Sequence, residues 1–250
     1  MDGGFYMIID FHVEIGDNIY YETSLSVEDI LRVIDTWKIS YALITPAYGV
    51  AYIYDFDEAN REIYEICKKH VNLVGMGTVN PWFKQKSLVE LEKIFHVYGF
   101  KGLKLIPYLQ GFGINHKIVY YVMEYLAKEK AVLYIPSGYH PQSPLEIADI
   151  ADAFPEVNIV MGFAGFTDFW MEVLPAMKRH SNLFTDISCQ SNVRAIKEAI
   201  KVLGSERFLF ASSLPYSDIE IEYEKIELLG LNEADKENIL WRNAKKLLKI

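Results

Sequence analysis

Short apolar or β-branched runs alternate with amphipathic stretches eight times along this chain, and this alternation constrains the fold most strongly. Such runs are typical of buried strands, and stretches with apolar residues on one face are typical of surface helices. Alternating strands and helices predict a parallel sheet, and eight such units close naturally into a barrel. The predicted strands cover residues 7–11, 41–45, 73–78, 102–106, 131–135, 158–161, 183–187 and 207–211.

Helical patterns lie between and after these runs. The stretch from Ser26 is typical, because Ser26 can cap a helix and Asp29 stands at its third position. A last helix is expected over 233–248, where Asn232 can cap it and lysines near its end match the helix dipole. The other predicted helices cover residues 56–69, 86–98, 116–129, 144–153, 168–179, 192–203 and 219–229.

These elements predict an α/β fold, a single (β/α)8 TIM barrel with an extra C-terminal helix, as one domain over residues 1–250. A chain of this length can form one such barrel, and no low-complexity linker or shift in composition divides it. The alternative is an open doubly wound sheet, but no Gly-x-Gly-x-x-Gly follows the first strand. The barrel is therefore the better prediction.

Composition limits the function classes. The net charge of −9 argues against non-specific binding to nucleic acid or to an anionic membrane, which both need a basic surface. Cys67 and Cys189 make no disulfide framework, which fits a reducing compartment. No apolar stretch reaches the length of a membrane span, and no basic segment precedes an apolar run at the N-terminus. We expect a soluble cytoplasmic protein.

The barrel also predicts where a site would lie, because active sites in this fold form at the C-terminal ends of the strands. His12 and Glu14 are two residues apart on the first strand, so their side chains share one face. Other chemically interesting residues at predicted strand ends are Tyr48, Asn80, Trp82, Tyr108, Ser137, Tyr139, His140, Phe163, Ser188, Cys189, Gln190, Ser212 and Ser213.

Six segments in register resemble one family. Residues 9–14, IDFHVE, are similar to an Ile-Asp-x-His-x-His motif, and residues 210–215, FASSLP, are similar to Phe-Gly-Ser-Asp-x-Pro. The chain as a whole resembles the amidohydrolase-related family of metal-dependent barrels, which includes aminocarboxymuconate-semialdehyde decarboxylase. The remaining matching segments are residues 99–112, 133–138, 154–165 and 229–248.

The resemblance places the family's metal ligands at five positions, which hold His12, Glu14, Pro136, Phe163 and Ser213. Only His12 is unchanged, and the side chains of proline and phenylalanine cannot bind a metal ion. Catalytic zinc generally needs about three protein ligands and an open position for water. We therefore predict no cofactor and no metal-hydroxide chemistry, with zinc or another divalent metal as the alternative.

A rebuilt site is the competing hypothesis. Lys104 should share the inward face of the fourth strand with Ile106, and some members of the wider superfamily carry a carboxylated lysine on that strand. His12, Glu14 and Lys104 could then bind a metal ion together. His140 lies in the loop after the fifth strand and could reach the same pocket, although a histidine in such a loop is more often a turn residue.

His12 and Glu14 are the candidate catalytic acid and base, or a hydrogen-bonded pair that only shapes the first strand. Cys189 could be a thiol nucleophile or an inert small residue, and Asp186 could point inward or outward. The predicted ligand-binding residues, which could instead fill a dead site, are Tyr48, Trp82, Tyr108, Tyr139, His140, Phe163 and Ser213.

The leading hypothesis is a divergent family member that binds a small organic ligand at the strand C-termini without metal-hydroxide catalysis. The second is a metal-dependent hydrolase or carbon–carbon lyase, similar to a decarboxylase, with a rebuilt metal site. A third is a structural subunit that uses the barrel as a scaffold. Whether the protein is an enzyme stays open, and the resemblance is compatible with a homodimer.

Overall fold

The computed structural model describes residues 7–19 and 21–250. Its centre is a nine-stranded sheet in the order β2-β1-β3-β4-β5-β6-β7-β8-β9. Neighbouring strands are parallel from β1 and β3 onward, and only β2 runs antiparallel, against β1. The strands are β1 Ile9–Asn18, β2 Thr23–Leu25, β3 Tyr41–Pro46, β4 Leu73–Gly77, β5 Gly102–Lys104, β6 Val132–Pro136, β7 Asn158–Gly162, β8 Leu183–Asp186 and β9 Phe208–Leu209.

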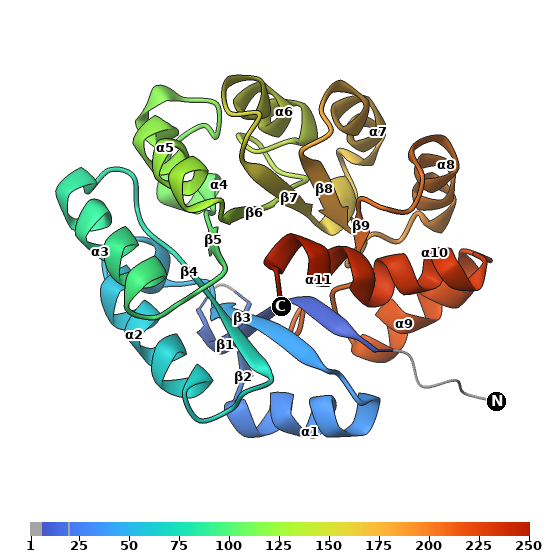
Figure 1. Ribbon diagram of the computed structural model, residues 1–250, viewed down its shortest axis with the longest axis horizontal. Coiled ribbons are helices and arrows are strands. Elements are labelled where there is room, and N and C mark those ends of the chain that lie inside the picture. Colours follow the sequence, from blue (N-terminus) through green and yellow to red (C-terminus); the bar gives the residue numbers. More distant parts are fainter. Residues whose placement is uncertain (1–6, 20) are drawn as a thin grey trace.

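Helices surround this sheet as a ring in Figure 1, where α11 lies near the middle of the view. Most of them follow a strand and lead to the next, as the sequence pattern predicts. None of the helices in the described residues is long and apolar enough to cross a membrane. They are α1 Val27–Trp37, α2 Phe56–Cys67, α3 Lys84–His96, α4 Pro107–Gln110, α5 Tyr120–Glu129, α6 Pro144–Ala153, α7 Trp170–Arg179, α8 Val193–Leu203, α9 Ile219–Leu228, α10 Glu233–Glu237 and α11 Asn243–Leu248.

The sheet curls until its first parallel strand meets its last. The backbone N–H of Phe11 donates to the carbonyl of Phe210 at 3.0 Å, and that of Glu14 donates to the carbonyl of Leu214 at 2.9 Å. In the other direction, the N–H of Ser213 donates to the carbonyl of His12 at 3.0 Å. The result is a curled, mostly parallel α/β fold that is TIM-barrel-like.

Two apolar layers hold this arrangement. One lies between the sheet and the helices, and the other fills the interior of the sheet, where Ile9, Phe11 and Leu209 pack against Ala244 and Leu247 of α11. The end of the chain therefore covers one opening of the barrel. The predicted helix over 233–248 is helical throughout in the structure, but a turn of π-helix over Asn238–Arg242 joins α10 to α11.

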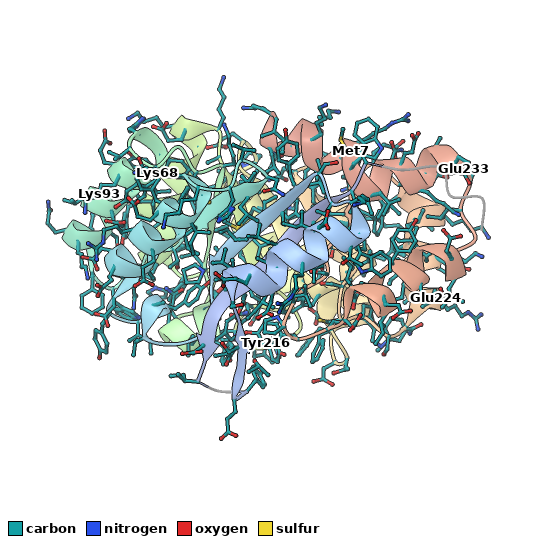
Figure 2. All side chains as sticks on the ribbon, turned by 90° about the horizontal axis from the view of Figure 1, so that it is seen from below. Met7, Lys68, Lys93, Tyr216, Glu224 and Glu233 are labelled. Carbon is teal, nitrogen blue, oxygen red and sulfur yellow. The ribbon has the colours of Figure 1, made fainter. Side chains whose placement is uncertain are left out.

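The first strand is longer than predicted and changes face along its length. A register shift between Asp10 and Val13 interrupts its pairing with β3. Because of this shift, the side chains of the consecutive residues Phe11 and His12 both contact the interior Tyr134 ring. Beyond the barrel, β1 continues into an antiparallel hairpin with β2, which the sequence analysis missed. Figure 2 shows the hairpin projecting on the side of Tyr216, away from the Met7 end.

Candidate functional site

Three charged or polar side chains from the middle of β1 and the end of β5 meet inside the barrel. His12, Glu14 and Lys104 are all completely buried. The Lys104 ammonium pairs with Glu14 Oε1 and lies 2.7 Å from His12 Nε2. His12 Nε2 and Glu14 Oε1 are 3.5 Å apart. Both predictions about orientation are confirmed: His12 and Glu14 share one pocket-facing side, and Lys104 points inward toward them.

The other oxygen of Glu14 is also occupied. Oε2 accepts a hydrogen bond from the backbone N–H of Tyr48 at 3.2 Å and another from the hydroxyl of Tyr216. Aromatic rings surround the ammonium, with the ring centroids of Tyr48, Tyr52 and Tyr134 at 4.9, 5.7 and 5.8 Å from Lys104 Nζ. The buried positive charge therefore has one carboxylate, one imidazole and three π-faces as partners.

A hydrogen-bonded chain leaves the other side of His12 and crosses to the neighbouring strands. His12 Nδ1 lies 3.1 Å from Ser213 Oγ, which lies 2.6 Å from Ser188 Oγ. The Ser188 hydroxyl donates to Asp186 Oδ1, and the Tyr134 hydroxyl donates to Asp186 Oδ2 at 2.7 Å. We call His12, Glu14, Lys104, Asp186, Ser188 and Ser213 the polar cluster.

The donor inventory assigns the histidine tautomer. The Lys104 ammonium has only donors, so His12 Nε2 must accept and the proton resides on Nδ1, which donates to Ser213. Burial, followed by the nearby Lys104 ammonium, lowers the pKa of His12 to about 4. His12 is therefore neutral at pH 7, which agrees with this tautomer.

The ion pair of Glu14 and Lys104 balances two opposing effects. Burial alone raises the pKa of Glu14, but the Lys104 ammonium and the contact with His12 hold it below its usual value. Burial lowers the pKa of Lys104, and Glu14 partly offsets that effect. Two opposite charges thus compensate each other in a site that water does not reach.

Two further carboxyl groups lie in the same interior. Burial raises the pKa of Asp186, and that of Asp10 rises to about 7. Asp10 Oδ1 accepts hydrogen bonds from the backbone N–H groups of Ser212 at 2.8 Å and His12 at 3.3 Å. Asp10 therefore braces the two strand ends that supply His12 and Ser213 to the polar cluster.

The backbone is strained where these strands end. Phe163, Cys189 and Ser213 have φ values of 67°, 55° and 51°, in the left-handed region that residues other than glycine seldom adopt. They follow three successive strands, β7, β8 and β9. Such strain clusters at functional sites because the surrounding structure must hold it in place. This observation supports the strand C-termini as the functional end of the barrel.

A pocket of about 460 Å³ opens directly over the polar cluster. Tyr216 and Tyr48 line it and also contact Glu14, while Phe163 lines it and packs edge-on against the His12 ring at 5.6 Å between centroids. We call it the mouth pocket, and its lining residues are Tyr21, Tyr48, Tyr139, Phe163, Phe166, Cys189, Tyr216 and Ser217.

The structure brings some of the predicted ligand-binding residues together at this pocket. Tyr48, Tyr139 and Phe163 line it, and Ser213 lies in the polar cluster. Tyr108 does not line it but stacks on Tyr139, with 5.6 Å between ring centroids. Tyr108 could therefore orient a pocket wall rather than contact a ligand.

Two of the predicted ligand-binding residues lie elsewhere. The Trp82 side chain is 56% exposed, and its ring N–H donates to the carbonyl of Gln110 at 2.9 Å. The His140 side chain is 68% exposed and pairs with Glu146 at 3.2 Å. The loop after β6 turns His140 outward, so neither residue lines the mouth pocket.

Cys189 lines the mouth pocket, but burial followed by the charge of Glu222 raises the pKa of its thiol to about 12. A thiolate nucleophile at neutral pH is therefore not supported. Sequence reasoning missed Tyr134, placed Ser188 at a strand end without assigning it a role, and left Asp186 undecided. Tyr134 had a signal, since it lies two residues before Pro136 and shares its face.

Within the part of the chain that the structure describes, no group of three or more His, Cys, Asp or Glu side chains is placed to hold a metal ion. The ligand positions that the resemblance implies hold Pro136 at the end of β6, Phe163 after β7 and Ser213 after β9. The Lys104 ammonium contacts His12 and Glu14, the two matched positions that hold an imidazole or a carboxylate.

A curled parallel sheet with a polar cluster and a pocket at its strand C-termini defines a TIM-barrel-like protein of the kind whose function resides at that end. The model of the amidohydrolase family matches residues 38–250, so the chain belongs to that family. The expected family resemblance is thereby confirmed.

Individual relatives add detail. The chain is 25% identical over 118 residues to a gamma-resorcylate decarboxylase of Polaromonas sp. strain JS666, and this match spans 40% of the chain and 36% of that relative. The crystal structure of 5-carboxyvanillate decarboxylase from Sphingomonas paucimobilis has a TM-score of 0.82 at 16% identity, covering 98% of this chain and 99% of that one. The same enzyme from Novosphingobium aromaticivorans, complexed with manganese and 4-hydroxy-3-methoxy-5-nitrobenzoic acid, has a TM-score of 0.79 at 19% identity, covering 98% and 96%.

Proposed function

We propose that this protein is a divergent (β/α)8 barrel of the amidohydrolase family, with an extra C-terminal helix, that binds a small aromatic ligand in the mouth pocket without a catalytic metal ion. The observation that carries the proposal is the position of the Lys104 ammonium, which contacts both His12 and Glu14. These are the two matched positions that retain metal-binding side chains.

The donor set does not fit a divalent cation. His12 and Glu14 would supply two ligands, fewer than the three or so that catalytic zinc generally uses. Pro136 and Phe163 supply none, and the Ser213 hydroxyl is already in a hydrogen-bonded chain with His12. A metal ion beside Lys104 would also place two positive charges against each other in a buried site.

The walls of the mouth pocket support an aromatic ligand. Six of its lining residues are aromatic, and rings in offset or edge-on contact stabilise a bound ring beyond the burial of its surface. Tyrosine hydroxyls add polar groups at fixed points, as is usual in small-molecule sites. A volume of about 460 Å³ is within the range of such pockets.

The relatives favour a second candidate, a metal-dependent carbon–carbon lyase with a rebuilt site, since the three named above are decarboxylases. In this alternative Lys104 would be carboxylated or would move away from His12 and Glu14. The compensated ion pair of Lys104 and Glu14 supports the metal-free proposal over this alternative.

Elemental analysis of protein purified without chelator tests the proposal. We expect no stoichiometric zinc, manganese or iron, before or after reloading, in the wild type and in a His12→Ala, Glu14→Ala double variant. The matched control is the His140→Ala, Glu146→Ala variant, which removes an exposed histidine–carboxylate pair. Stoichiometric metal that the first double variant loses and the second retains would overturn the metal-free proposal and favour the lyase.

A further inference from the structure

The mouth pocket offers no positive charge. Its lining side chains are tyrosines, phenylalanines, one cysteine and one serine, so no lysine, arginine or histidine among the described residues faces a ligand there. A carboxylate moved from water into such a pocket would lose its hydration without gaining a counter-charge. That loss costs several kcal/mol unless a cation or several strong donors replace the water.

One buried cation, Lys104, lies beneath the pocket and is already compensated. Lys104 is completely buried and does not line the pocket, and the Tyr48 ring, which does, lies 4.9 Å from its Nζ. Its charge is paired with Glu14. A ligand carboxylate could use Lys104 only by displacing Glu14, which would then be buried without a counter-charge.

Two of the hydroxyl donors that line the pocket are also engaged. The hydroxyl of Tyr216 donates to Glu14, and that of Ser217 donates to Glu222 Oε1 at 2.6 Å. Cys189 contributes a protonated thiol, because burial and Glu222 raise its pKa to about 12. What remains for a ligand is aromatic surface with neutral polar groups at its edge.

We propose that the mouth pocket takes an uncharged aromatic molecule of the phenol class and rejects the corresponding aromatic carboxylate. This inference rests on the proposed ligand-binding function and deepens it. It separates this chain from the named relatives, whose names identify them as decarboxylases of aromatic acids. The selectivity follows from a polar cluster whose only full positive charge is internally neutralised.

Three matched probes test the inference by calorimetric titration: resorcinol, 2,6-dihydroxybenzoate, and the methyl ester of that acid. The ester removes the charge of the acid and adds one methyl group. We expect resorcinol and the ester to bind at least about tenfold more tightly than the acid, a difference of about 1.4 kcal/mol. Titrations with and without manganese should give the same order.

Two variants sharpen the test. Glu14→Gln leaves the Lys104 charge uncompensated, and Tyr139→Lys places an ammonium in the pocket lining without touching the polar cluster. Each should shift the preference toward the acid by about tenfold or more. Glu224→Gln removes an exposed carboxylate on α9 and should leave the preference unchanged.

The outcomes separate the two proposals. If the acid binds wild-type protein as tightly as its ester, the charge selectivity is wrong while the ligand-binding function stands. If none of the three probes binds at concentrations up to about 10 mM, which corresponds to a binding free energy weaker than about −3 kcal/mol, both proposals fail for this ligand class.

Discussion

A Lys104→Met variant should lose about 3–5 kcal/mol of its free energy of unfolding, because it leaves the Glu14 carboxylate buried without a counter-charge. Methionine fills a similar volume, so the loss reports the charge rather than a cavity. Urea denaturation with linear extrapolation measures it, provided that the slope with denaturant stays the same as in wild type.

The second half of this experiment removes both charges. A Lys104→Met, Glu14→Gln double variant should recover most of the lost stability, because no unpaired charge remains. The matched surface control is Lys68→Met, which breaks an exposed pair with Glu65 and should cost less than about 1 kcal/mol. Equal losses for Lys104→Met and Lys68→Met would contradict the compensated ion pair at the barrel mouth.

The Asp10→Asn variant should lose stability at acidic pH, where the stability of the wild type changes little. The pKa of Asp10 is about 7 in the folded protein, raised from 3.8. The contribution of this carboxyl to the free energy of unfolding therefore decreases as the pH rises from 3.8 to about 7. The pKa of His12 is about 4 in the folded protein, lowered from 6.5. The contribution of this imidazole to the free energy of unfolding therefore decreases as the pH falls from 6.5 to about 4. Between about pH 4 and 6.5 the two slopes oppose and nearly cancel.

Because asparagine cannot titrate, only the His12 slope remains in the variant. The free energy of unfolding of Asp10→Asn, relative to wild type, should fall by about 1.4 kcal/mol for each pH unit between about 6.5 and 4.5. Urea titrations at three pH values measure the difference. The exposed Asp168→Asn is the control and should track wild type. A pH-independent difference for Asp10→Asn would show that the Asp10 pKa is not raised in the folded protein.

The sequence predicted the fold because its elements are local. Each strand is a short apolar run and each helix has one apolar face, so periodicity alone located most of them. The β1–β2 hairpin was not predicted, because β2 has only three residues, Thr23–Leu25, and depends on pairing with β1 rather than on its own sequence pattern. The π-helical turn between α10 and α11 likewise leaves no signal in an apolar periodicity that continues across it.

The candidate site could be predicted only in part. The alternation of side chains along a strand predicted that His12 and Glu14 share one face and that Lys104 points inward, because each of these predictions concerns a single strand. That the Lys104 ammonium would lie between the other two depends on how far side chains reach across a closed barrel. The outward turn of His140 and the hydrogen-bonded serines depend on loop geometry after β6, β8 and β9, which no periodicity specifies. Cytoplasmic location and a homodimer stay predictions.

The seam that closes the barrel and the polar cluster are made of the same residues. The N–H of Ser213 donates to the carbonyl of His12, and their side chains also meet, across 201 positions of sequence. The entropy of closing so large a loop opposes contacts of such long range until the intervening chain is ordered. We therefore expect the pocket to be assembled in the step that joins the two ends of the sheet, so that an incompletely folded chain has no site to present.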